Sequence, residues 1–125
     1  MIALACISAI LLHAAPAVEV VDHRVVVRAG SGETMQSPQE GLWSVAMAWR
    51  DEWPAEWCHG QPDQVSQEGP WTVVTGKVET PQGVWETRDA YRVDCGVVQC
   101  VRRYTWRGDE TAHDCTLSVR FEAEG

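Results

Sequence analysis

The sequence predicts an all-β fold, most simply an antiparallel β-sandwich built as a meander of hairpins, with a small β-barrel as the alternative. Two observations indicate this fold class. Short segments rich in Val, Thr and aromatic residues recur about every ten residues, with Gly, Pro, Asp and Ser between them. Several of these segments alternate apolar and polar side chains, which is the period of a half-buried strand. The Cys–Trp–Cys spacing of immunoglobulin domains is absent, so a true immunoglobulin domain is not supported.

The first seventeen residues are expected to be a signal peptide, followed by a single domain at residues 18–125. Ile2 to Leu12 is almost wholly apolar, and Ala15-Pro16-Ala17 fits an A-x-A cleavage site, although no Lys or Arg precedes the apolar run. The run is too short to span a bilayer. We therefore expect an exported protein, periplasmic or extracellular, cleaved near Ala17.

The next segments predict strands joined by turns. Val18 to Ala29 is rich in valine and suits one or two strands. Gly30 to Gly41 has turn composition throughout. Leu42 to Arg50 alternates, so its odd-numbered side chains, which include Trp43 and Trp49, should share one face.

The segment that follows carries Trp53 and Trp57. Because Trp53 precedes Pro54, it should avoid the helical region. We expect Trp49 to end a strand, Trp53 to be extended and residues 54–57 to form a single turn or short 3₁₀ piece. His59 to Pro70 is expected to be a loop.

The second half predicts four strands in a hairpin-linked antiparallel meander. The segments are residues 71–80, 84–93, 97–106 and 114–121. The last is the clearest half-buried strand, with Cys115, Leu117, Val119 and Phe121 on one side. A hairpin between the last two segments would place Cys100 near Cys115.

Four cysteines remain after removal of the signal peptide, and an even number in an exported chain predicts two disulfides. The hairpin favours Cys100–Cys115, which leaves Cys58–Cys95. A metal site is the alternative, since thiol and imidazole groups are neighbours in the sequence. However, no C-x₂-C pair exists, and we expect neither a metal nor another cofactor.

The net charge of −8 bears on the class of partner. An acidic domain repels phosphate backbones and anionic lipid surfaces, so nucleic acid is not an expected partner. The charge itself identifies no partner.

Seven tryptophans are an excess for a chain of 125 residues. The apolar C–H faces of sugars lie flat on indole rings, which predicts contact with polysaccharide or cell-envelope material. Trp53 and Trp57 lie in a charged, loop-like stretch and are the predicted ligand-binding residues, with Glu56 and His59 as polar neighbours. The opposing interpretation is that these indoles cap the core of a structural or protein-interaction domain.

Catalysis is a third hypothesis. Asp51, Glu52, Glu56 and His59 could supply the general acid and base of a small hydrolase if two of them converged in a cleft. No phosphate-binding loop, G-x-S-x-G elbow or H-E-x-x-H helix is present. The sequence therefore favours a binding domain over an enzyme.

The run GKVETPQGVWETRDAYRVDCGVVQCVRRYTWRG, followed by TLSVRF, resembles the N-terminal β-sandwich region of large exported bacterial sugar-processing enzymes. The shared elements are a Gly turn before Trp85, the strand end at Trp106-Arg107-Gly108 and the amphipathic last strand. The resemblance implies an accessory module or a fragment of a larger exported enzyme, and it assigns no catalytic residue to this chain.

Overall fold

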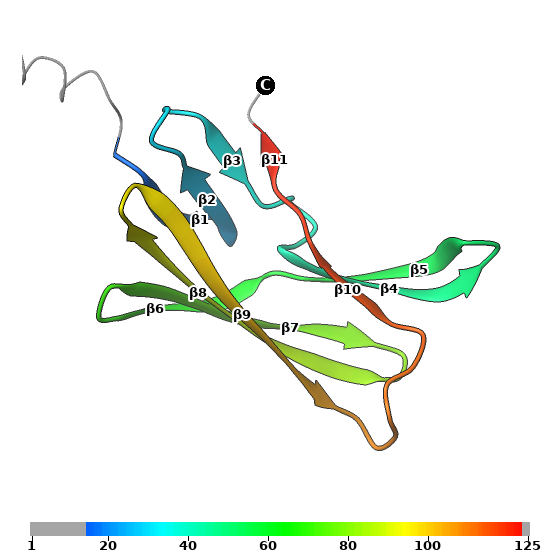
Figure 1. Cartoon of the computed structure of the whole chain (residues 1–125). Helices are drawn as coiled ribbons and strands as arrows, with labels where there is room; N and C mark the ends of the chain where they lie inside the picture. The colour runs from blue at the N-terminus through cyan, green and yellow to red at the C-terminus, as the bar shows by residue number, and fades with distance from the viewer. Residues whose placement is uncertain (1–14, 124–125) are drawn as a thin grey trace, which may run out of the picture.

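The computed structural model describes residues 15–123, and every regular element in them is a β-strand (Figure 1). The strands are β1 (Ala17–Val21), β2 (Arg24–Arg28), β3 (Thr34–Gln36), β4 (Trp43–Arg50), β5 (Trp53–Gly60), β6 (Pro62–Glu68), β7 (Trp71–Thr80), β8 (Gly83–Asp94), β9 (Val97–Arg107), β10 (Thr116–Val119) and β11 (Glu122–Ala123). The all-β prediction is confirmed. Most of the predicted signal peptide, residues 1–14, lies outside the described residues.

The strands form three antiparallel sheets, with the orders β1-β2-β3-β11, β10-β4-β5 and β6-β7-β8-β9. The third sheet is a meander, and its β8–β9 ladder runs without interruption from Val84↔Arg107 to Asp94↔Val97. Alternating Val, Thr and aromatic residues favour this long pleated pairing. The strands predicted at 71–80, 84–93 and 97–106 are thus present and paired in the expected order.

The fourth strand of the predicted meander pairs elsewhere. β10 lies beside β4 in another sheet, with Leu117 opposite Val45, and not beside β9. Its half-buried side chains pack against the core cluster that contains Val45 and Trp43, which offers more apolar contact than the edge of β9. The hairpin between residues 97–106 and 114–121 is therefore wrong.

Three further segments differ from their predictions. β3 lies within residues 30–41, where only turn was expected, and it pairs with β2 and β11. β5 runs from Trp53 to Gly60, where a turn was expected at 54–57, because Asp51 and Glu52 (φ 50° and 65°) already reverse the chain. Positive φ at both residues is the geometry of a two-residue type I′ hairpin turn. β5 is an edge strand, which tolerates the missing N–H of Pro54. β6 replaces the predicted loop at 59–70, and it is an exposed edge strand whose composition gives no apolar alternation.

The predicted disulfides, Cys58–Cys95 and Cys100–Cys115, are not formed, and all four described cysteines are free thiols. The cause is the pairing of the last strand. Cys100 lies on β9 opposite Tyr91, whereas Cys115 precedes β10 in another sheet. Cys58 lies on β5 opposite Val45, and Cys95 lies in the β8–β9 turn.

A buried carboxylate ties two of the sheets together. Asp89 on β8 is fully buried. Its Oδ1 accepts hydrogen bonds from Trp43 Nε1 (3.0 Å) and Arg102 Nε (2.9 Å). Its Oδ2 accepts from Tyr91 Oη (2.6 Å) and Arg102 Nη2 (2.8 Å). Four donors on one carboxylate satisfy its lone pairs, as a charge away from water requires.

The same cluster shifts the ionisation of its members. Burial raises the pKa of Tyr91 far above its usual range, and the neighbouring Asp89 charge raises it further. Burial alone would lower the pKa of Arg102, but its hydrogen bonds to Asp89 outweigh this and raise it. Tyr91 thus stays protonated and Arg102 stays charged at ordinary pH values.

Candidate functional site

The β4–β5 hairpin extends away from the rest of the strands in Figure 1 and carries three exposed tryptophans. The exposed fractions are 40% for Trp49, 72% for Trp53 and 46% for Trp57. The interpretation of Trp53 and Trp57 as core caps therefore does not fit the structure.

The strand register divides these indoles between two faces. Trp53 is opposite Arg50 and Trp57 is opposite Ala46, so both lie on the face that Ala46 shares. Trp49 is opposite Pro54 and lies on the other face. Because side chains alternate along a strand, His59 joins Trp53 and Trp57. We call these three residues of β5 the aromatic platform.

Neighbouring contacts hold one end of the aromatic platform in place. The rings of Trp57 and His59 are nearly parallel, with planes 6° apart and centroids 6.4 Å apart. His59 Nδ1 lies 2.8 Å from Ser44 Oγ, which fixes the orientation of the imidazole. Ser44 and Ala46, the cross-strand neighbours, are small and buried, so the larger rings lie over them. The Trp57–His59 end of the aromatic platform is therefore held in place without a ligand, which lowers the entropic cost of binding one.

Glu56 does not join the aromatic platform. It lies opposite Met47, on the face of β5 away from Trp57 and His59. Only three of the four predicted ligand-binding residues are therefore brought together: Trp53, Trp57 and His59.

The hydrolase hypothesis finds no cleft in the structure. Asp51 and Glu52 form the hairpin turn, and His59 follows Glu52 by seven residues along an extended strand, about 23 Å at 3.3 Å per residue. Glu56 faces away from His59. No carboxylate of this set converges on His59, so the set cannot perform general acid–base catalysis as a unit.

The cysteine thiols do not form a nucleophilic centre. Burial raises the pKa of the thiols of Cys58, Cys100 and Cys115, which keeps them protonated at neutral pH. In residues 15–123, no three His, Cys, Asp or Glu side chains are grouped as metal ligands would be.

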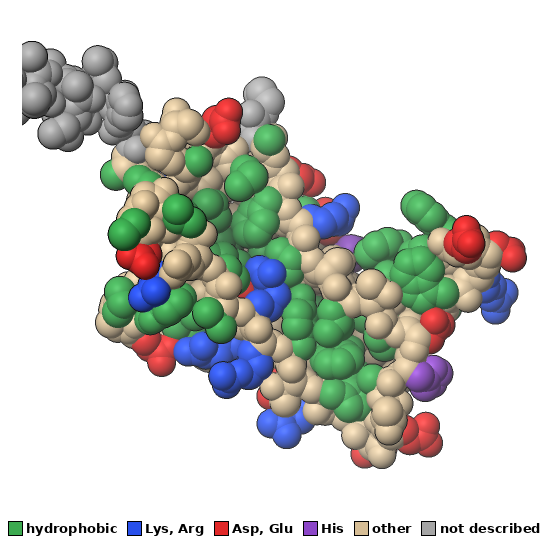
Figure 2. All heavy atoms as spheres, in the orientation of Figure 1, with side chains coloured by type: hydrophobic (Ala, Val, Ile, Leu, Met, Phe, Trp, Pro, Cys, Tyr) green, Lys and Arg blue, Asp and Glu red, His purple; other side chains and the backbone are tan. Residues whose placement is uncertain are grey.

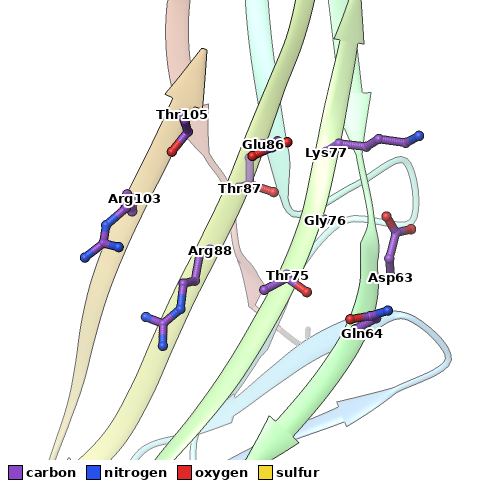
Figure 3. A pocket seen from close by; sticks show the side chains of 10 residues that line it. All are labelled: Asp63, Gln64, Thr75, Gly76, Lys77, Glu86, Thr87, Arg88, Arg103 and Thr105. Atoms are coloured by element: carbon purple, nitrogen blue, oxygen red, sulfur yellow. The ribbon is translucent and has the colours of Figure 1, made fainter. Parts of the chain in front are cut away.

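A groove that sequence reasoning missed lies on the outer face of the β6–β9 sheet, the face away from Asp89 (Figure 3). Its volume is about 410 Å³. Its lining residues are Asp63, Gln64, Thr75, Gly76, Lys77, Glu86, Thr87, Arg88, Arg103 and Thr105. We call it the polar groove. Strand alternation is the signal that could have found it, because Arg103 faces outward while its neighbour Arg102 faces Asp89.

A second hollow of about 320 Å³ joins the aromatic platform to the polar groove. It contains His59 of the aromatic platform, and it shares Asp63 and Lys77 with the polar groove. The junction arises because β5 leads into β6 at Gln61, which carries the chain from one sheet to the next. A continuous surface therefore runs from β5 to the outer face of β6–β9.

No family model matches the chain, and neither a curated protein nor a solved structure matches it. Within the described part of the chain, no helix has the length and apolarity needed to cross a bilayer.

Proposed function

We propose that this chain is an exported, non-catalytic β domain of the sandwich type that binds polysaccharide through the aromatic platform. The observation that carries the proposal is the exposure of Trp53 and Trp57 on one face of β5 (72% and 46%). Together with the resemblance of residues 76–108 to the β-sandwich region of exported sugar-processing enzymes, it favours carbohydrate as the ligand.

Physical chemistry supports this use of the exposed indoles. A tryptophan buries about 150–250 Å² when it is covered, so leaving two uncovered forgoes a large favourable transfer free energy. Trp53 and Trp57 are four residues apart on a strand, about 13 Å, which matches an extended oligosaccharide better than a single sugar. His59 supplies a polar ring atom beside the indoles for a sugar hydroxyl.

Truncating the aromatic platform should remove binding. We expect Trp57→Ala and Trp53→Ala each to weaken polysaccharide binding about tenfold or more, because each loses the apolar area that a sugar face would cover. The measurement is a titration of the protein with soluble β-glucan, xylan, mannan, peptidoglycan fragments and polygalacturonate, in which binding is followed by the change in intrinsic tryptophan fluorescence.

Trp49→Ala is the matched control, since it removes an exposed indole from the same hairpin but from the opposite face. It should bind as the unaltered protein does. The proposal fails if no polysaccharide of the panel changes the fluorescence, or if Trp49→Ala reduces binding as much as Trp57→Ala.

A further inference from the structure

Two arginines face each other in the polar groove. Arg88 on β8 and Arg103 on β9 are cross-strand partners, so their side chains lie on the same face of the sheet (Figure 3). Like charges directly opposite each other destabilise a sheet. The Glu68 carboxylate, 2.8 Å from Arg88, offsets the charge of one of the two arginines.

Most cations on this face have a carboxylate partner. Lys77 pairs with Glu79 (3.3 Å), Arg92 with Asp94 (3.5 Å) and Arg107 with Glu86 (3.3 Å). Arg88 pairs with Glu68 at 2.8 Å. Among the described residues, no carboxylate lies within ion-pairing distance of Arg103.

This uncompensated charge stands out in a chain with a net charge of −8. Figure 2 shows Lys and Arg side chains over the part of the molecule where β8 and β9 lie, with Asp and Glu side chains beside them. The polar groove is lined by three cations, Lys77, Arg88 and Arg103, and by two carboxylates, Asp63 and Glu86, and among the described residues Arg103 is the cation of this set without an ion-pair partner.

The surroundings of Arg103 suit a carboxylate carried on a sugar. Thr75 and Thr105 line the same groove and offer hydroxyl groups to sugar hydroxyls. A guanidinium binds a carboxylate through two parallel N–H···O bonds. The groove volume of about 410 Å³ lies in the range of small-ligand sites.

We propose that the polysaccharide bound by this protein is acidic: a uronate places its carboxylate on Arg103 in the polar groove while sugars further along the same polysaccharide chain stack on Trp57 and Trp53. This inference rests on the proposed function. The hollow between the two sites is lined by His59 and Lys77 and by the carboxylates of Glu40, Asp63 and Glu79, so the carboxylate contacts of the ligand are confined to the polar groove.

The net negative charge of the protein does not prevent this recognition. At physiological ionic strength the Debye length is about 8 Å, so charges elsewhere on the surface are screened and the cations that touch the ligand dominate. The same argument predicts that binding to the polar groove weakens as salt is added.

The experiment compares polygalacturonate with the same polymer after reduction of its carboxylates to alcohols, using fluorescence titration and calorimetry. We expect the unreduced polymer to bind about tenfold more tightly or better. Arg103→Gln should abolish this preference, because it removes one charge-assisted, bidentate contact. Arg28→Gln is the matched control, since Arg28 is an exposed arginine on β2 in another sheet, and it should keep the preference. Unchanged thermal unfolding of each variant establishes that the fold is intact.

Several results would overturn the inference. If the reduced and unreduced polymers bind equally well and Trp57→Ala weakens the binding of both, the carboxylates are not recognised. The inference of an acidic ligand is then wrong, while the proposed polysaccharide binding still holds. Equal binding of polyglutamate, or equal loss in Arg28→Gln, would reveal ion exchange without sugar recognition. Absence of binding to every polysaccharide of the panel would overturn both proposals together.

Discussion

Replacing Asp89 with alanine is expected to lower the free energy of unfolding by about 3–5 kcal/mol, a large part of the stability of a domain of this size. The carboxylate is fully buried and accepts four hydrogen bonds. Its removal leaves the Arg102 charge, the Trp43 N–H and the Tyr91 hydroxyl without their partner. Urea unfolding followed by circular dichroism measures the loss.

A double variant separates the ion pair from the packing around it. Asp89→Leu combined with Arg102→Met removes both charges and should cost much less than the sum of the two single changes, because no charge is left unpaired and only the Trp43 N–H and the Tyr91 hydroxyl lose their acceptor. If Asp89→Ala costs less than about 1 kcal/mol, or if the single changes add without coupling, the cluster does not tie the sheets together as described.

Gly60→Ala is expected to destabilise the protein by about 1–3 kcal/mol or more. Gly60 ends β5 where it crosses β7, and an added Cβ would lie 2.2 Å from the Lys77 carbonyl oxygen and 2.9 Å from Val78 Cγ2. The Lys77 carbonyl oxygen belongs to the backbone and cannot rotate away as a side chain could, so β5 and β7 would have to move apart. The same crossing forms the hollow between the aromatic platform and the polar groove, so we also expect weaker polysaccharide binding.

Gly30→Ala provides the comparison. Its φ is not in the left-handed region, and an added Cβ would meet only Pro16 Cγ at 3.7 Å, an ordinary contact. It should leave stability unchanged or slightly raised, since alanine restricts the unfolded chain. Equal unfolding midpoints for Gly60→Ala and the unaltered protein would contradict the close crossing of β5 and β7.

The strands that sequence predicts well are those with strong alternation. β4, β7, β8 and β9 place Val or aromatic residues at several alternate positions of one face, with other residue types at the remaining positions, and this partial alternation identifies them. β6 escapes prediction because it is an exposed edge strand with almost no apolar side chains. The pairing of β10 with β4 is also not predicted, because pairing between strands that are far apart in the sequence depends on which core face is free and not on local composition. The wrong disulfides follow from that one pairing.

The candidate site was predictable in part. Trp53, Trp57 and His59 were identified from their residue types and their charged surroundings, but the sequence left open whether the two indoles are exposed or cap the core. The even spacing of Trp49, Trp53 and Trp57 also fits a single face. The two-residue turn at Asp51 and Glu52 sets the register that separates Trp49 from the other two. Strand alternation could have placed Arg103 on the outer face of the predicted β7–β8–β9 meander, but the polar groove also needs β6, which the sequence did not predict.

The most direct test of the account is a site-resolved titration of the seven indole N–H signals by NMR. The probes are hexamers of galacturonate and of glucose. We expect the indole signals of Trp53 and Trp57 to shift on titration with at least one hexamer, while that of Trp43, which is buried and bonded to Asp89, stays in place. The absence of any shift at Trp53 and Trp57 with both hexamers, or shifts confined to Trp49, would contradict the account.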